Sequence, residues 1–234
     1  MASNNEKTFG SKLANADTLA THLATFSTYS PVRPEESVVN YKGLITAIKT
    51  NNALVASTKT TYSQATDKRV KLFAKNTDSM LKTLAPIAGQ IRAKFGKTSK
   101  EAEYIASLIV KIRGESSKKL KKDDEGEFVS QSERSYGSQT QTFTDIITTL
   151  TTYGTDYAPT NVKIKLPALN AQLTALITAN TAVTTAYGAY KPAKDNRLVQ
   201  YADLKDRSNR IKESVKSQFG TSSNEYKLIK GLSI

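Results

Sequence analysis

The sequence contains no cysteine, no tryptophan and a single histidine, His22, among its 234 residues. Without cysteine the chain can form neither a disulfide framework nor a thiolate metal site. One histidine cannot supply a histidine-rich zinc or transition-metal centre. These absences predict a protein without a cofactor. They are also compatible with a reducing compartment, so we expect a cytoplasmic location.

Long apolar runs are missing too. No window of about 20 apolar residues occurs, so the sequence predicts no integral membrane segment. Residues 1–7 carry no apolar run, which argues against a cleaved signal peptide. Hydrophobic residues make up 38% of the chain. That content suits long amphipathic helices with a thin core better than a compact α/β domain.

The sequence also lacks the patterns that carry catalysis. It has no glycine-rich phosphate loop, no Gly-x-Ser-x-Gly elbow, no His-Glu-x-x-His motif and no Glu-x-x-His pair. The acidic pair Glu35–Glu36 is better explained as a helix start, where carboxylates favour the positive end of the dipole. Residues 123–125 lack the spacing of a calcium loop. We therefore expect no catalytic, metal or cofactor-binding residue and no enzyme activity.

What the chain does contain is a second version of itself. The clearest matches, all at one constant separation, are Tyr29 with Tyr157, Tyr62 with Tyr190, Asp67 with Asp195, and Arg69 with Arg197. After Ala74 the second version is four residues shorter, because Phe95–Gly96 matches Phe219–Gly220. We call this correspondence the repeat match. It predicts an all-α protein of two tandem pseudo-symmetric helical-bundle repeats, about four helices each, with long antiparallel helices.

The predicted domain boundaries follow from the repeat match. Residues 1–113 form repeat 1, residues 114–135 form a charged linker, and residues 136–234 form repeat 2. The linker carries a block of lysines followed by a block of acidic residues, as exposed segments often do. The two repeats either form separate bundles or pack as one continuous bundle.

Helix boundaries within a repeat follow from caps and proline. We expect first helices over about 11–28 and 139–153, and second helices over about 34–65 and 166–190. Lys191–Pro192 should stop the second helix of repeat 2, since proline cannot continue the hydrogen-bond ladder.

The third and fourth helices have capping signals of their own. Asp67 and Asp195 are predicted N-caps of the third helices, which places the matched tyrosines and arginines around them at a hairpin tip. A Phe-Gly pair should end each third helix. Capping boxes at 98–101 and 222–225 should then start short fourth helices.

The second helix of repeat 2 is chemically unusual, because residues 166–190 contain no charged side chain. The matching residues 43–66 contain only Lys49 and Lys59. A surface helix normally has a charged outer face. The simpler interpretation is that this helix is surrounded within the chain, and the alternative is an oligomer or filament interface.

Near-heptad spacing along the two second helices selects the residues that form one packing side of each helix. The candidate packing or assembly residues are Leu169, Leu173, Leu176, Asn180, Val183 and Tyr190 of repeat 2, with Ile48, Asn52, Val55 and Tyr62 of repeat 1. Asn52 and Asn180 match one another, and a buried asparagine can fix the register of paired helices.

Positive charge is in excess: 34 basic and 21 acidic residues give a net charge of +13. The excess is concentrated in residues 67–113, which hold 11 basic and four acidic residues. Such a segment attracts polyanions, although a net charge also serves simply to keep a protein soluble. The candidate polyanion-binding residues are Lys68, Arg69, Lys71, Lys75, Lys82, Arg92, Lys94, Lys97 and Lys100.

The leading hypothesis is a non-enzymatic structural or interaction protein on a duplicated helical scaffold, which binds itself or another protein. The alternative is sequence-independent binding of nucleic acid or a ribonucleoprotein through residues 67–113. An anionic membrane surface ranks third as a partner.

Overall fold

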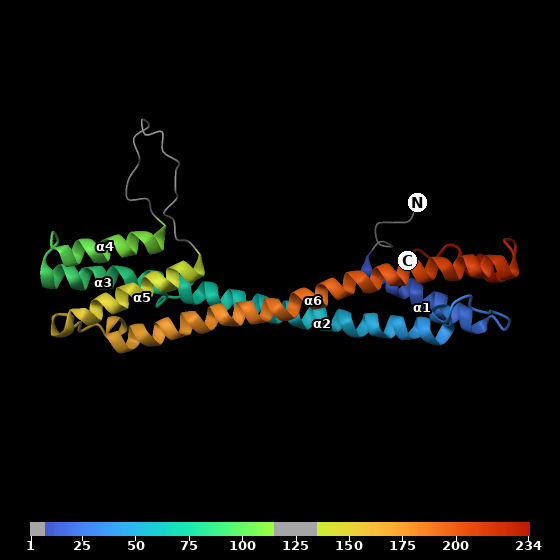
Figure 1. The fold of residues 1–234 in the computed structure, drawn as a ribbon, viewed down its shortest axis with the longest axis horizontal. Coiled ribbons are helices and arrows are strands. Elements are labelled where there is room, and N and C mark those ends of the chain that lie inside the picture. The colour runs from blue at the N-terminus through green and yellow to red at the C-terminus, as the bar shows by residue number, and fades with distance from the viewer. Residues whose placement is uncertain (1–7, 115–134) are drawn as a thin grey trace, which may run out of the picture. The chain divides into compact units, whose positions relative to one another are not determined.

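The computed structural model describes residues 8–114 and 135–234, and the regular elements in these two ranges are all helical (Figure 1). The prediction of an all-α protein is confirmed for this part of the chain. The predicted linker lies outside the described residues, apart from Gly114 and Ser135 at its ends. No helix in the two ranges is long and apolar enough to cross a membrane.

The chain divides into two compact units. Unit 1 combines the residues up to Thr60 with Tyr187–Ile234, and unit 2 is Thr61–Ala186. Both divisions fall inside long helices, α2 (Val38–Val70) and α6 (Leu166–Phe219). Each unit therefore contains residues from both predicted repeats.

Unit 1 is built from helices whose apolar faces meet in one core. Its elements are α1 (Phe9–Thr25), the 3-10 helix η2 (Pro34–Glu36), the first part of α2, the last part of α6, and α7 (Asn224–Ile229). The core joins Leu19 of α1, Tyr41 of α2, Leu204 and Ile211 of α6, and Ile229 of α7. Unit 1 thus depends on packing between segments far apart in sequence.

Unit 2 has a separate core. Its elements are the end of α2, the π-helix η3 (Lys71–Lys75), α3 (Met80–Phe95), α4 (Lys100–Arg113), α5 (Tyr136–Thr152), the 3-10 helices η4 (Gly154–Asp156) and η5 (Val162–Ile164), and the first part of α6. Helix α4 packs against both α3 and α5 (Figure 1). Leu84, Ile105, Phe143 and Leu176 are fully buried in this core.

The helix ends after Phe95 and Phe219 confirm the predicted glycine stops. Gly96 and Gly220 adopt φ angles of +96° and +89°, which residues with a Cβ atom rarely adopt. The hydroxyl of Ser99 then caps α4 by accepting the amide N–H of Ala102 at 3.1 Å, and Ser223 caps α7 in the same way. Each cap therefore lies one residue later than the first residue of the predicted box.

The predicted helix stop at Lys191–Pro192 is wrong, because α6 continues through Pro192 to Phe219. Asp67 and Asp195 lie inside α2 and α6, so neither caps a helix and the predicted hairpin tip does not form there. A proline in a helix interior removes one backbone hydrogen bond. The neighbouring turns keep theirs, and buried side chains such as Ala193 hold this part of α6 in unit 1.

The first predicted repeat is four residues longer than the second after Ala74, and in the structure a helix is interrupted in this region. Helix α2 passes into η3, the chain turns after Lys75, and α3 begins at Met80. The corresponding part of the second predicted repeat continues without a break in α6. π-Helical turns arise from inserted residues and are frequent at functional sites.

Candidate functional site

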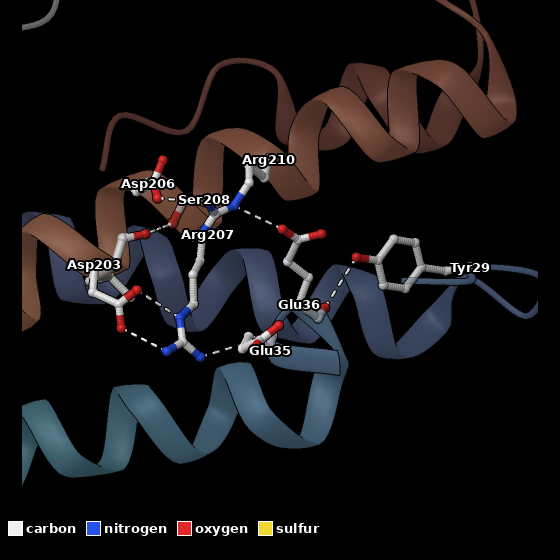
Figure 2. A network of polar contacts seen from close by, with 9 residues as sticks. Tyr29, Glu35, Glu36, Asp203, Asp206, Arg207, Ser208 and Arg210 are labelled. Carbon is white, nitrogen blue, oxygen red and sulfur yellow. Dashed lines mark hydrogen bonds and ion pairs between the residues drawn. The ribbon is translucent and has the colours of Figure 1, made fainter. Parts of the chain in front are cut away.

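The most polar buried region of unit 1 surrounds Glu36 in η2 (Figure 2). Glu36 is only 2% exposed, and its Oε1 lies 2.9 Å from Nε of Arg210 on α6. These two atoms do not meet with hydrogen-bond geometry, so charge attraction holds the pair. Arg210 also forms an ion pair of 2.9 Å with Asp206, whose side chain is exposed.

Two tyrosines extend this polar region into the core. The hydroxyl of Tyr29 donates to the carbonyl oxygen of Glu36 at 3.1 Å, as Figure 2 shows. The hydroxyls of Tyr41 and Ser208 lie 2.6 Å apart, and Ser208 donates to the carbonyl of Leu204. Tyr41 is therefore the donor to Ser208. Burial raises the pKa of Tyr41, and burial with the nearby Glu36 charge raises the pKa of Tyr29 to about 12, so both are neutral donors at pH 7.

Arg207 provides a third connection between η2 and α6. Its guanidinium donates two hydrogen bonds to Asp203, at 2.8 and 2.7 Å, and one to the carbonyl of Glu35 at 3.3 Å. The hydrogen bonds to Asp203 raise the pKa of Arg207. The carboxylates of Glu36, Asp203 and Asp206 are each paired with an arginine. The arrangement therefore fastens η2 onto α6 rather than presenting a general base.

A hollow of about 270 Å³ lies in unit 2, beside the break between η3 and α3. Its lining residues are Leu72, Asn76, Asp78, Thr83, Lys163, Ala168, Gln172 and Ala175. The amide nitrogen of Gln172 donates to the carbonyl of Asp78 at 2.7 Å, and Thr83 donates to the carbonyl of Met80. The Gln172 amide and the Thr83 hydroxyl thus already have hydrogen-bond partners within the protein. The hollow is also smaller than most ligand pockets.

The nine predicted polyanion-binding residues all lie in unit 2. Two are in the last turn of α2, two on η3, three on α3, and two at or just before the start of α4. All are exposed except Arg69, which is half-buried.

Four of these nine residues have partners within the fold, among them Lys82, whose Nζ donates to the carbonyl of Lys75 at 3.3 Å. Lys71 pairs with Asp67 at 2.6 Å, and Lys94 pairs with Asp156 at 3.0 Å. The Arg69 guanidinium lies over the ring of Tyr136, 4.0 Å from its centroid. Arg69 therefore contributes to packing by a cation–π contact.

The predicted packing or assembly residues lie on the sides of α2 and α6 that pack against other elements. Leu169, Leu176, Val183, Ile48 and Val55 are buried. The other five, Leu173, Asn180, Tyr190, Asn52 and Tyr62, are half-buried. The heptad-like spacing thus marks a side of each helix that is covered within the chain.

The two matched asparagines make different hydrogen bonds. The Asn52 amide donates to the hydroxyl of Tyr201 at 2.9 Å, within unit 1. The Asn180 amide donates to the hydroxyl of Thr140 at 3.1 Å, within unit 2. Each one ties a long helix to another element of its own unit, in keeping with a role in register.

The expectation that the uncharged helix is surrounded within the chain is wrong for the outer side of α6, which is exposed. In unit 2, Leu169, Leu176 and Val183 are buried, but Ile177 is 50% exposed. Beside it the exposed residues include Thr174, Thr178, Thr181 and Thr185. We call these four threonines and Ile177 the uncharged face. Its lack of charge does not follow from burial in the chain.

The threonine hydroxyls of this face are directed at the helix itself. Thr174, Thr178 and Thr181 each donate to the carbonyl four residues earlier, at 3.0, 2.8 and 3.2 Å. Such back-bonding satisfies the hydroxyl locally. The face therefore presents methyl groups without charges and with few free donors.

Sequence reasoning did not identify Glu36, Ser208 and Arg210 as a buried polar cluster, nor the hydrogen bond that joins Tyr41 to it. Glu36 was explained as a favourable residue at a helix start. One signal could have found it, since Glu36 corresponds to Ile164 in the repeat match. An acid at a position where the other repeat has isoleucine indicates a buried charge that needs a partner.

The fold and this polar cluster define an all-helical protein whose polar residues join its own segments. Among the described residues, no group of three or more His, Cys, Asp or Glu side chains could hold a metal ion. No protein-family model, curated protein or solved structure matches the chain. Function must therefore be argued from the residues themselves.

Proposed function

We propose that the protein is a non-enzymatic scaffold, built on an internally duplicated helical unit, that works by associating with a second copy of itself. The uncharged face of α6 is the observation that carries this proposal. A helix that exposes Ile177 and four threonines, within residues 166–190 that contain no charged side chain, has a surface suited to being covered.

Equivalent aromatic contacts in the two units support the duplication. The rings of Phe9 and Tyr201 in unit 1 lie 4.5 Å apart, centroid to centroid. The rings of Tyr136 and Phe73 in unit 2 lie 4.8 Å apart. In the repeat match, Phe73 corresponds to Tyr201. Phe9 corresponds to Tyr136, because the second version has one extra residue, Asp156, before its Tyr-x-Pro turn. Matched positions thus make matched contacts.

Two further pairs of contacts follow the same rule. The Arg197 guanidinium lies over the ring of Phe9 at 4.8 Å, as that of Arg69 lies over Tyr136. The hydroxyl of Tyr157 donates to the carbonyl of Ile164 at 2.7 Å, as that of Tyr29 does to Glu36. In this proposal each unit combines the first two helices of one repeat with the last two of the other.

A second copy is the occupant that best fits the uncharged face. Two copies of this face can approach without bringing like charges together, although the whole chain carries +13. A strongly charged partner would gain nothing from a surface that has no charge to offer. The same patch on two molecules pairs naturally about a twofold axis.

Ile177→Glu should convert the associated protein to monomers, because a charge facing its symmetry mate would lose water without gaining a partner. Light scattering after size-exclusion chromatography, with and without nuclease treatment, measures the mass. Leu228→Glu on α7 is the matched control, since Leu228 is 51% exposed and Ile177 50%. A wild-type protein that is monomeric at high concentration would overturn the proposal.

Polyanion binding is the second candidate, favoured by the exposed basic residues of unit 2. Of the nine candidates only Lys71 and Lys94 form ion pairs with described residues, which leaves charges such as Lys75, Lys97 and Lys100 available for phosphates. This binding would be independent of sequence, because phosphate contacts carry no base information.

If unit 2 binds nucleic acid, Lys97→Glu with Lys100→Glu should weaken retention of random-sequence duplex DNA and reduce its salt dependence by about two charges. Lys227→Glu with Lys230→Glu, exposed on α7 and just beyond it in unit 1, is the control. Fluorescence anisotropy across a salt series provides the measurement. No binding by the wild type at low salt excludes this candidate.

A further inference from the structure

Four polar residues that join segments of unit 1 have apolar counterparts in unit 2. We call Glu36, Tyr41, Ser208 and Arg210 the polar core set. The first three are buried, and Arg210 is half-buried at the edge of the core. In the repeat match Glu36 and Tyr41 correspond to Ile164 and Leu169, which are both buried.

The counterparts of Ser208 and Arg210 follow from the burial pattern of α6 and α3. Leu204, Ser208, Ile211 and Val215 are buried on α6 before Phe219, and Met80, Leu84, Ile87 and Ile91 are buried at the same spacing before Phe95. Ser208 therefore corresponds to Leu84, and Arg210 to Pro86. Unit 2 thus has a well-formed core without these polar groups.

We infer that the polar core set decides which segments of the duplicated chain pair with each other. In the structure, the segment with Glu36 and Tyr41 packs on the segment with Ser208 and Arg210. If each repeat instead closed on itself, Glu36 and Tyr41 would face the leucine and proline of α3. A buried carboxylate and a buried hydroxyl would then have no partner.

The reverse mismatch would occur in the second repeat. Ser208 and Arg210 would lie against Ile164 and Leu169, whose side chains offer neither an acceptor nor a negative charge. Both units of the self-closed arrangement are therefore disfavoured by the same four residues. Buried polar pairs that reject wrong partners are an attested way to fix which helices associate.

The self-closed arrangement is a realistic competitor because the sequence contains the signals for it. Asp67 and Asp195 are of the residue type that favours an N-cap, and Pro192 disfavours a continuous helix, so both long helices contain residues that locally favour a turn. The structure has continuous helices at these positions. The inference rests on the proposed duplication but not on the proposed self-association.

Cysteine cross-linking distinguishes the two arrangements, since the chain has no cysteine of its own. The amide of Gln218 bonds the backbone of Ser30, so Ser30→Cys with Gln218→Cys reports the observed pairing. Lys94 is the counterpart of Gln218, so Ser30→Cys with Lys94→Cys reports self-closure. In the otherwise native sequence a short bismaleimide, which spans more than a disulfide can, should link the first pair within one chain and should not link the second.

Both cysteine pairs are then placed in a variant carrying Glu36→Ile, Tyr41→Leu, Ser208→Leu and Arg210→Ala. We expect the self-closed link to rise at least about tenfold over background, because the discrimination against this arrangement is removed. Ile211→Ala, which leaves a cavity beside the same helix, is the control for destabilisation alone. It should leave the self-closed link at background. Non-reducing gels separate links within a chain from links between chains.

Three results would overturn the inference. The first is a four-residue variant that folds, by circular dichroism, and keeps only the native link. The second is a control Ile211→Ala that produces as much self-closed link as the variant. The third is that, in the otherwise native sequence, the cysteines at positions 30 and 218 are not cross-linked. If the four-residue variant does not fold, the Tyr41→Leu and Ser208→Leu pair alone must raise the self-closed link, or the inference fails.

Discussion

Arg210→Ala should lower the free energy of unfolding by about 3 kcal/mol, since it leaves a buried carboxylate without its countercharge. Glu36 is 2% exposed, and Arg210 is its ion-pair partner at 2.9 Å. The cost comes mainly from the carboxylate that remains in the core, rather than from the attraction that is lost. Urea unfolding followed by circular dichroism measures the change.

Arg207→Ala is the matched control, one turn earlier on α6. Its partner Asp203 has a side chain that is 35% exposed, so water can take over when the guanidinium is removed. A loss of about 1 kcal/mol or less is expected for such a pair. Equal losses for the two variants would mean that the burial of Glu36 has no special cost.

Pro192→Ala should raise the free energy of unfolding by about 2–3 kcal/mol, because proline in a helix interior costs about 3 kcal/mol. Pro192 lies in the middle of α6, and its side chain is exposed, so alanine removes no packing. The carbonyl of Gly188 would gain the amide N–H that proline lacks. In a chain of this size the gain corresponds to a rise of roughly 5 °C or more in Tm.

Pro167→Ala provides the comparison within the same helix. Pro167 is the second residue of α6, where a backbone N–H has no partner inside the helix in any case. Its replacement should change Tm little or lower it slightly. If Pro192→Ala also failed to raise Tm, α6 would have to be broken at Pro192 in solution, contrary to the structure.

The glycine stops were local features that could be predicted, whereas the predicted caps at Asp67 and Asp195 and the stop at Pro192 were local signals that did not hold. The Phe-Gly ends at 95–96 and 219–220 were correct because a glycine stop depends only on the backbone next to it. The caps at Ser99 and Ser223 were predicted one residue early, since several hydroxyls in a row can each act as a cap. Such an ambiguity is decided by the position of the first buried side chain of the helix.

The candidate sites could not be predicted in the same way, because they depend on contacts between residues that are distant in the sequence. Leu169 and Leu176, which the spacing selected, are both buried. The spacing could not reveal that the opposite side, with Ile177, would be left exposed. Glu36 was assigned to a helix start because its partner, Arg210, lies near the other end of the chain.

The amino-acid order alone determined that the described residues are helical and where glycine ends their helices. These properties come from backbone geometry and from the helical period of about 3.6 residues, which act over a few turns. Tertiary packing alone decided that α6 continues past Pro192 and that each unit draws on both halves of the chain. Burying long apolar faces outweighs one lost hydrogen bond, and that balance depends on segments that meet only after folding.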